Sequence, residues 1–119
     1  MARNKGALWI LKPANLSRGR GIYLLDSPNE IHVEDVSVLS RYIHNPLLIN
    51  GHKFDLRIYV CITSLDPLRL YVYKEGLARF ASEAYVGGAK GNRFAHLTNY
   101  SINKKNKRYC PNTHADHDD

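Results

Sequence analysis

The sequence is poor in cysteine, in long apolar runs and in acidic residues. Its 119 residues include only two cysteines, Cys61 and Cys110, which argues against a disulfide framework and favours a reducing, cytoplasmic compartment. No apolar stretch approaches the roughly 20 residues of a membrane span, and residues 1–6 lack the apolar core of a secretory signal. We therefore expect neither secretion nor a membrane partner.

Acidic residues are outnumbered, with 11 Asp and Glu against 17 Lys and Arg, and the formal net charge is +6. This balance favours an anionic partner, but charge alone does not choose among nucleotide phosphates, nucleic acid and an acidic protein segment. The polar end of the chain holds Cys110 and His114, and their spacing matches no zinc pattern, so no metal site is predicted there. A length of 119 residues suits one domain at most, and a hydrophobic fraction of 44% is that of a folded protein.

Short apolar runs separated by turn residues predict a β-rich fold. We expect strands at 8–11 and 22–25, joined as a hairpin, then a helical turn at 30–34 and a strand at 36–43. Between 53 and 63 strict alternation places apolar side chains on one face and predicts a half-buried strand. Turns at 64–67 and at Glu75-Gly76 would lead to strands at 68–74 and 77–81, so three strands would lie side by side. From Asn103 onward the chain is polar and is expected to be unstructured.

Three charged side chains, Lys53, Asp55 and Arg57, occupy alternate positions of the strand at 53–63 and therefore project from one face, roughly 6–7 Å apart. Such a row can bind a polyphosphate with its metal, because Arg and Lys donate to phosphoryl oxygens and Asp can orient a ribose hydroxyl or a magnesium-bound water. On the pattern alone, a solvated strand face with paired charges is the favoured alternative.

Weaker signals accompany this strand. Lys12 and the loop at 17–21 form a second candidate anion site, because glycines let backbone N–H groups approach phosphate, although the loop is no Walker A sequence and equally fits a tight hairpin. Arg79 lies among apolar residues and needs a partner if buried, either a carboxylate or an anion. The segment 96–101 suits a loop that contacts phosphate or ribose, and it equally suits a local turn.

Six segments taken in order resemble the tubulin tyrosine ligase-like family: Trp-Ile-Leu-Lys-Pro at 9–13, Ser-Arg-Gly-Arg-Gly-Ile at 17–22, Ser-Arg-Tyr-Ile at 40–43, Lys-Phe-Asp-Leu-Arg-Ile-Tyr-Val at 53–60, Glu-Gly-Leu-Ala-Arg-Phe-Ala at 75–81 and His-Leu-Thr-Asn-Tyr-Ser at 96–101. The second and fifth are more similar to the polyglutamylase branch. The resemblance implies an α+β class, with a partial ATP-grasp domain at 1–105 dominated by antiparallel strands. A polar, disordered tail would follow at 106–119.

The resemblance also implies an activity, namely ATP-dependent attachment of glutamate to glutamate side chains of tubulin tails through an acyl-phosphate. ATP and Mg²⁺ would be the cofactors, tubulin or microtubule C-terminal tails the partners, and the cytoskeleton, including the cilium or basal body, the location. Arg57 and Arg79 would be catalytic, steadying the transferred phosphoryl group. The implied cofactor-binding residues are Lys12, Ser17, Arg18, Gly19, Arg20, Gly21, Arg41, Tyr42, Ile43, Lys53, Asp55, Thr98 and Asn99.

Within that set, Lys12 and the loop at 17–21 would approach the ATP phosphates, the backbone of 41–43 would meet the adenine, and Lys53 and Asp55 would hold the nucleoside side. Nucleic acid is the weaker partner, because no motif for it is present.

The sequence departs from the family pattern at both ends. Family members carry a magnesium-binding segment of acidic residues and asparagine downstream, and a further ATP-contacting lysine upstream, and neither is found here. We therefore expect a central fragment of the ligase that lacks activity. The alternative is a truncated non-catalytic module, or an incomplete gene model, that binds acidic tubulin tails.

Overall fold

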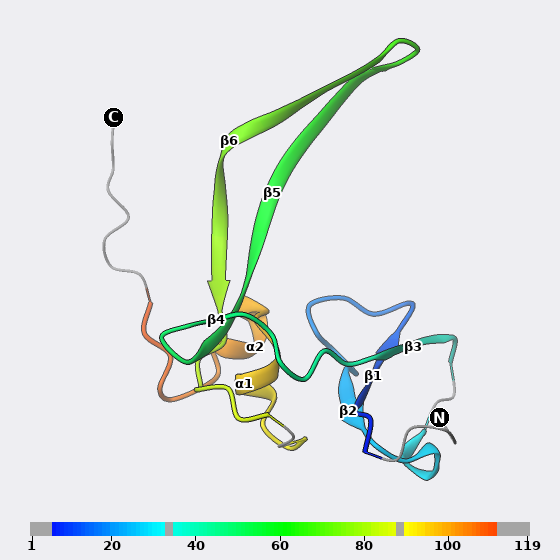
Figure 1. The fold of residues 1–119 in the computed structure, drawn as a ribbon, viewed down its shortest axis with the longest axis vertical. Helices are drawn as coiled ribbons and strands as arrows, with labels where there is room; N and C mark the ends of the chain where they lie inside the picture. The colour runs from blue at the N-terminus through cyan, green and yellow to red at the C-terminus, as the bar shows by residue number, and fades with distance from the viewer. Residues whose placement is uncertain (1–5, 33–34, 88–89, 112–119) are drawn as a thin grey trace.

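The computed structural model describes residues 6–32, 35–87 and 90–111. These residues form two three-stranded antiparallel sheets, joined by loops and accompanied by short helices (Figure 1). The predicted α+β class, dominated by antiparallel strands, is confirmed. Within the described ranges no helix has both the length and the apolar character needed to cross a membrane.

The first sheet has the order β2-β1-β3, built from β1 (Trp9–Pro13), β2 (Tyr23–Leu25) and β3 (Ser37–Arg41). The expected hairpin is present, since β1 and β2 pair antiparallel. The strand predicted at 36–43 is also present, and it pairs with the other edge of β1. The expected helical turn is a 3-10 helix placed slightly earlier, at Pro28–Glu30, and residues 33–34 lie outside the described residues.

The second sheet has the order β4-β5-β6, with β4 (Leu48–Ile49), β5 (His52–Leu65) and β6 (Leu68–Phe80). Ile49 pairs with His52, so only Asn50 and Gly51 connect β4 to β5. Both have a positive φ, 50° and 76°, as a two-residue hairpin turn of type I′ requires. Asn and Gly are the residues that adopt this conformation most readily, which explains the turn.

The predicted break at Glu75-Gly76 is wrong, because β6 continues through it and pairs with β5 almost throughout. Gly76 lies opposite Ile58, and a Cβ added to it would lie 2.7 Å from the backbone oxygen of Arg57. The glycine therefore allows the two strands to approach closely, and it does not mark a turn. The third strand of this sheet is β4, at the opposite edge.

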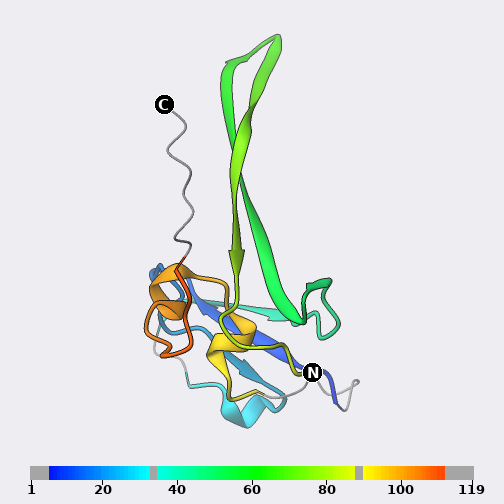
Figure 2. The ribbon, with the colours of Figure 1, turned by 90° about the vertical axis from the view of Figure 1, so that its left-hand side faces the viewer.

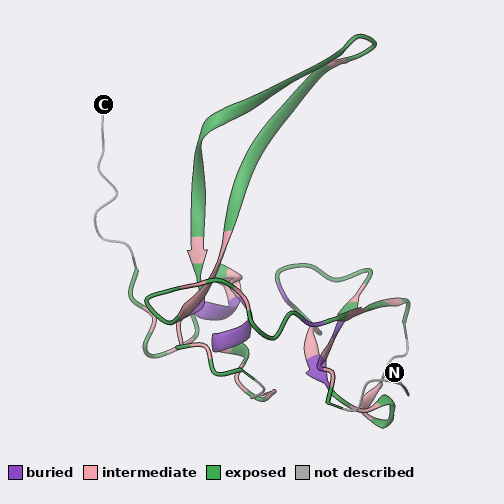
Figure 3. Ribbon diagram, viewed as in Figure 1, coloured by how far each residue is buried: buried purple, intermediate pink, exposed green. Residues whose placement is uncertain are grey.

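The prediction of a half-buried strand is wrong for most of β5. The apolar side chains do share one face, but Leu56 is 62% exposed, Ile58 61% and Val60 54%. The hairpin of β5 and β6 projects away from the remainder of the molecule, and nearly all of it is exposed (Figures 1–3). Alternation indicates which face of a strand is apolar, whereas whether that face is covered depends on other parts of a fold.

The core lies where the first sheet meets two short helices, α1 (Arg93–His96) and α2 (Tyr100–Asn103). Its buried members come from the beginning and the end of the described chain, namely Leu8, Ile10, Leu24, Tyr42, Leu97 and Ile102. Figure 3 shows these buried segments in purple, in β1 and β2 and in both helices. Burial of these side chains holds residues 93–103 against the first sheet, with each side chain contributing about 1.5–3 kcal/mol relative to an exposed one.

The chain was expected to be unstructured from Asn103 onward, and this expectation is wrong for Asn103 itself. Asn103 ends α2 and is 1% exposed. Farther on, Asn106 donates to the side chains of Ser82 and Glu83, and Arg108 forms an ion pair with Glu83. The domain boundary at 105 and the disordered tail stay predictions, and residues 112–119, including His114, lie outside the described residues.

Candidate functional site

An ion pair at the base of the long hairpin joins its two strands. Asp55 of β5 and Arg79 of β6 are opposite each other in the strand register. The guanidinium donates Nε to Oδ1 at 2.7 Å and Nη2 to Oδ2 at 2.6 Å, and Thr98 donates its hydroxyl to Oδ2 at 2.9 Å. The partner that Arg79 was expected to need is therefore a carboxylate. The same carboxylate connects the hairpin to the segment between α1 and α2.

The protonation state of this group follows from its partners. Burial opposes ionisation of Asp55, but the hydrogen bonds from Arg79 and Thr98 outweigh it, and the pKa of Asp55 lies below its usual value. The hydrogen bond to Asp55 in turn raises the pKa of Arg79. Asp55 is therefore a carboxylate at neutral pH, and Arg79 is a guanidinium.

Lys53 lies two residues before Asp55 on the same face of β5, and its ammonium donates to two acceptors. Its Nζ donates to the Tyr42 hydroxyl at 3.1 Å and to the backbone oxygen of His96 at 3.0 Å. Burial and the positive charge of Lys12 lower the pKa of Lys53, against the opposing effect of Asp55. The structure thus brings together five of the predicted site residues, which are Lys53, Asp55, Arg79, Thr98 and, through its side chain, Tyr42.

Arg57 and Lys12 act on this cluster through their charge. Arg57 follows Asp55 on the same strand face, is exposed, and contributes to the lowered pKa of Asp55. Lys12 is an exposed residue of β1, and its charge reaches Lys53. Together with the ion pair, these cations give the face a surplus of donors over acceptors. This surplus favours binding of an anion.

The loop at 17–21 lies against the two helices. Arg18 and Gly19 have φ values of 60° and 75°, and their carbonyl oxygens accept hydrogen bonds from Ser101 at 2.9 Å and from Arg93 at 3.2 Å. A Cβ on Gly19 would overlap the side chain of Ile102 and reach within 3.0 Å of Asn99 Oδ1. The glycine is thus required both by its backbone conformation and by the close approach to α2.

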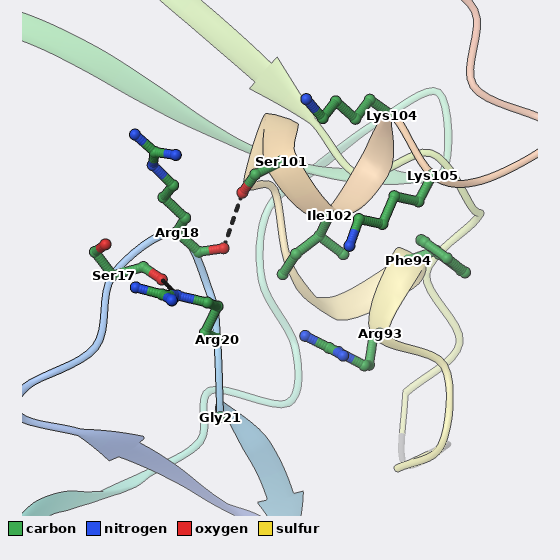
Figure 4. A pocket seen from close by; sticks show the side chains of 10 residues that line it. All are labelled: Ser17, Arg18, Arg20, Gly21, Arg93, Phe94, Ser101, Ile102, Lys104 and Lys105. Atoms are coloured by element: carbon green, nitrogen blue, oxygen red, sulfur yellow. Dashed lines mark hydrogen bonds between the residues drawn. The ribbon is translucent and has the colours of Figure 1, made fainter.

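A pocket of about 730 Å³ opens between this loop and the helices. Among the described residues that line it, five side chains are cationic and none is acidic. We call this the basic pocket, and its cations are Arg18, Arg20, Arg93, Lys104 and Lys105. Figure 4 shows that Arg20 folds back along Ser17, whereas Arg93 extends toward the loop from α1. This surplus of cations over carboxylates among the described lining residues makes the pocket suited to a polyanion.

The other predicted residues are placed as follows. Arg41 and Ile43 are exposed, and the backbone N–H of Tyr42 donates to the Leu8 oxygen at 2.8 Å. Asn99 lies beside Gly19 and directly precedes α2 as its N-cap residue. The predicted residues thus form two main groups. One is the strand-face cluster at the base of the hairpin, made of Lys53, Asp55, Arg79 and Thr98, and the other is the loop at 17–21 with its basic pocket. The roles of these residues stay predictions.

Sequence reasoning gave no role to Arg93 and Asn103, and it considered His96 only as part of the segment 96–101, yet all three residues help to build the site. Arg93 lines the basic pocket, and His96 holds Lys53. The buried amide of Asn103 accepts from the backbone and the hydroxyl of Ser82, and donates to the backbone oxygens of Leu97 and Asn99. This fixes the segment that carries Thr98 to the end of β6. A polar residue beside Lys104 carries no sequence signal of burial.

The chemistry of these donors fits ATP better than it fits magnesium. Lysine, arginine and threonine donors suit phosphoryl oxygens, and the Asp55 carboxylate suits a hydroxyl. Among the residues that the structure describes, no three His, Cys, Asp or Glu side chains gather closely enough to hold a metal ion. We therefore assign no step to magnesium on these residues.

Comparison with known proteins decides the family. The model of the tubulin-tyrosine ligase family matches residues 1–119. The chain belongs to this family. It is 58% identical over 103 residues to human tubulin polyglutamylase TTLL5, covering 85% of the chain and 8% of that relative. It is also 50% identical over 109 residues to human probable tubulin polyglutamylase TTLL2, covering 92% of the chain and 18% of that relative.

A third relative comes from another organism. Tubulin polyglutamylase ttll-5 of Caenorhabditis elegans is 49% identical over 107 residues, which cover 87% of the chain and 15% of that protein. The chain thus spans 8% to 18% of the length of these three members of the tubulin-tyrosine ligase family. The resemblance inferred from the motifs is confirmed, including the branch whose members are named tubulin polyglutamylases.

Proposed function

We propose that this chain supplies the nucleotide-facing part of an ATP-dependent ligase that adds glutamate to glutamate side chains in tubulin tails. The observation that carries the proposal is the strand-face cluster, in which Lys53, Asp55, Arg79 and Thr98 converge at the base of the hairpin. The supporting comparison is the identity of 58% to a relative named a tubulin polyglutamylase. Cytoskeletal and ciliary location is part of the same proposal.

The roles follow the chemistry of each group. Lys53 and Asp55 contact the nucleoside side of ATP, with the backbone at 41–43 near the adenine, while Lys12 and the loop at 17–21 contact the phosphates. Arg57 and Arg79 stabilise negative charge on the transferred phosphoryl group, since a guanidinium donates two N–H groups to neighbouring oxygens. Thr98 and Asn99 complete the polar wall. In this scheme Arg79 moves one donor from Asp55 to the phosphoryl group when the ligand binds.

The reaction balances in two steps. A glutamate carboxylate of the tubulin tail bonds to the γ-phosphorus of ATP, and ADP leaves. The amine nitrogen of the incoming glutamate then bonds to the acyl carbon, inorganic phosphate leaves with the electrons of the C–O bond, and the amine proton passes to solvent. Cations fixed beside the phosphoryl oxygens stabilise the charge that develops in both steps.

A binding measurement on the purified chain tests the nucleotide role. We expect ATP to bind, and Lys53→Ala or Arg57→Ala to weaken binding about tenfold, as expected for loss of one hydrogen bond to a charged group. The control is Arg69→Ala, on the exposed part of the hairpin far from the cluster. Equal affinities for the wild type and all three variants would contradict the assignment.

A second candidate function is retention of acidic tubulin tails without turnover. The basic pocket favours it, because five cations and no carboxylate are among the described residues that line this cavity of about 730 Å³. We expect Lys104→Ala with Lys105→Ala to reduce co-sedimentation with microtubules, and rising salt to weaken binding, since counterions screen such contacts. Lys74→Ala on the hairpin is the control, and microtubules whose tails have been cleaved should not bind.

Turnover separates the two functions. Incorporation of radiolabelled glutamate into tubulin, with ATP and Mg²⁺, would establish the purified chain as a ligase, whereas salt-sensitive binding without incorporation would favour the tail-binding module. The lack of activity expected from the sequence stays a prediction that this assay decides.

A further inference from the structure

Behind the Lys53 ammonium lie two buried side chains to which no part of the proposed reaction has been assigned. Tyr42 is 6% exposed and His96 2%. The Tyr42 hydroxyl lies 2.8 Å from His96 Nδ1 and 3.1 Å from Lys53 Nζ, so the three groups form a chain that ends at the strand-face cluster. We propose that the Tyr42 and His96 side chains are positioning residues that fix the Lys53 ammonium for its ligand. The proposal rests on the nucleotide role of Lys53 argued above.

The direction of each hydrogen bond follows from the donors available. An ammonium can only donate, so the Tyr42 oxygen accepts from Lys53. In the proposed chain the phenol donates its proton to His96 Nδ1, which lies 2.8 Å from the hydroxyl oxygen. This places the ring proton of a neutral His96 on Nε2. The chain therefore runs from Lys53 through Tyr42 to His96, with a defined tautomer at its end.

Neither aromatic residue has room to reorient. The His96 ring meets Tyr42 at 5.5 Å and Tyr85 at 5.3 Å between centroids, both edge to face. Tyr85 is itself anchored through its hydroxyl to the His44 oxygen at 2.8 Å, and Tyr42 through its backbone N–H to Leu8. His96 closes α1, and its own backbone oxygen is the second acceptor of Lys53. Contacts from the residue before β1, from α1 and from Tyr85 thus set one geometry.

These contacts restrict the flexible side chain of Lys53. An ammonium on a four-carbon stem has many rotamers, and ordering it on binding costs affinity. Two of its three donors are directed at Tyr42 and at the His96 backbone, which fixes the direction of the third. The Tyr42 ring also lies 4.8 Å from Nζ and favours the cation there. Preorganisation of this kind affects ligand affinity and leaves the donor itself unchanged.

The first experiment needs no nucleotide. In the purified chain labelled with nitrogen-15, we expect the His96 ring to show the tautomer protonated at Nε2, and the Lys53 ammonium to give a resolved signal because its hydrogen bonds slow exchange. Tyr42→Phe keeps the ring and removes the hydroxyl. It should weaken the preference for the Nε2 tautomer and broaden the Lys53 signal. A proton on Nδ1 in the wild type, or unchanged spectra in Tyr42→Phe, would overturn the proposal.

The second experiment measures ATP affinity. We expect Tyr42→Phe and His96→Ala to raise the Kd about tenfold, and His96→Asn, whose side-chain oxygen can replace Nδ1 as the acceptor, to restore it to within about threefold. Thermal unfolding of every variant identifies the folded fraction to which each Kd refers. A merely structural role predicts one Kd for all folded variants, and that result would refute positioning.

The two experiments keep the proposals separable. If the wild type binds no ATP while its spectra show the Nε2 tautomer and the Tyr42-dependent Lys53 signal, the nucleotide function fails and the positioning geometry stands. If the wild type binds ATP and the spectra or the affinities are insensitive to Tyr42, the positioning proposal fails and the nucleotide function stands.

Discussion

Asp55 receives three hydrogen bonds from two side chains, and this arrangement sets its chemistry. Two come from the guanidinium of Arg79 and one from the hydroxyl of Thr98. The pair is only partly shielded, since the Asp55 side chain is 40% exposed and that of Arg79 29%. Solvent therefore screens the attraction between the two charges. The ion pair contributes more to the orientation of Arg79 than to the stability of the fold.

Substitution of Asp55 by Asn should lower the free energy of unfolding by about 1 kcal/mol near neutral pH, the upper range for a partly exposed ion pair. Because the pKa of folded Asp55 lies below its usual 3.8, the carboxylate stabilises the fold above that value. Its contribution is lost as the pH falls through the folded pKa. Urea denaturation of both proteins should therefore show a difference at pH 6 that vanishes at low pH. A difference that stays constant over this range would contradict the assignment.

Asn103 presents the opposite case, a neutral side chain that is almost completely buried. Its amide makes four hydrogen bonds with Ser82, Leu97 and Asn99. Removal of the amide would take away the acceptor of the Ser82 backbone N–H and the donor to the Leu97 oxygen, and a buried group that loses its partner costs about 1–3 kcal/mol.

Asn103→Ala should therefore reduce stability by about 2–3 kcal/mol, whereas Asn45→Ala, at an exposed position, should change it by less than about 0.5 kcal/mol. Thermal or urea unfolding measures both. Similar losses for the two variants would show that the buried amide network contributes little.

At the scale of elements, two glycines with nearly the same backbone conformation have different surroundings. Gly19 has a φ of 75° and Gly51 a φ of 76°. Nothing lies within 4 Å of a Cβ placed on Gly51, whereas one placed on Gly19 would overlap Ile102. The pair therefore separates the cost of a left-handed backbone from the cost of a steric clash.

Gly51→Ala should cost about 1–2 kcal/mol, the penalty for an L residue in this conformation. Gly19→Ala should cost a further 1–3 kcal/mol or so, because the loop must also move away from α2. Urea denaturation compares the two variants directly. Equal losses would mean that the loop shifts without resistance and that its packing against α2 is loose.

Local patterns predicted several elements and part of the site. Apolar runs bounded by turn residues predicted β1, β2, β3 and β5, and alternation placed Lys53 and Asp55 on one face. The short β4 was missed although Asn50-Gly51 is a strong hairpin signal. The predicted turn at Gly76 is wrong because a glycine can mark a close approach of two strands as well as a turn.

The remainder depends on contacts between distant residues. That Arg79 faces Asp55 is set by the strand register, and that Thr98 joins them is set by packing 43 residues away. The roles of His96 and Asn103 depend likewise on what surrounds them. Local sequence patterns do not predict such contacts, because each contact depends on how distant segments pack in the folded chain.

At the scale of the whole molecule, the hairpin of β5 and β6 dominates the exposed surface. One face of it carries Ile58, Val60, Ile62, Leu70 and Val72, each more than half exposed. Val60 and Val72 lie opposite each other within this face. A contiguous apolar face of this kind is an aggregation liability, because association would remove it from water.

The purified chain should therefore associate as its concentration rises, and Val60→Lys with Val72→Glu should reduce association while keeping a favourable cross-strand pair. Val38→Lys, at an exposed position of β3, is the control. Sedimentation velocity over a range of concentrations measures the effect. Undiminished association in the double variant would place the responsible surface elsewhere.

The contact between the loop at 17–21 and α2 has a consequence for biosynthesis. The hydroxyl of Ser101 donates to the backbone oxygen of Arg18, which precedes it by 83 residues. At roughly 5–20 residues per second, about 4 to 17 seconds separate the synthesis of the acceptor from that of its donor. During that interval the nascent chain already contains both arginines of the loop, while the helix against which the loop packs has yet to be translated.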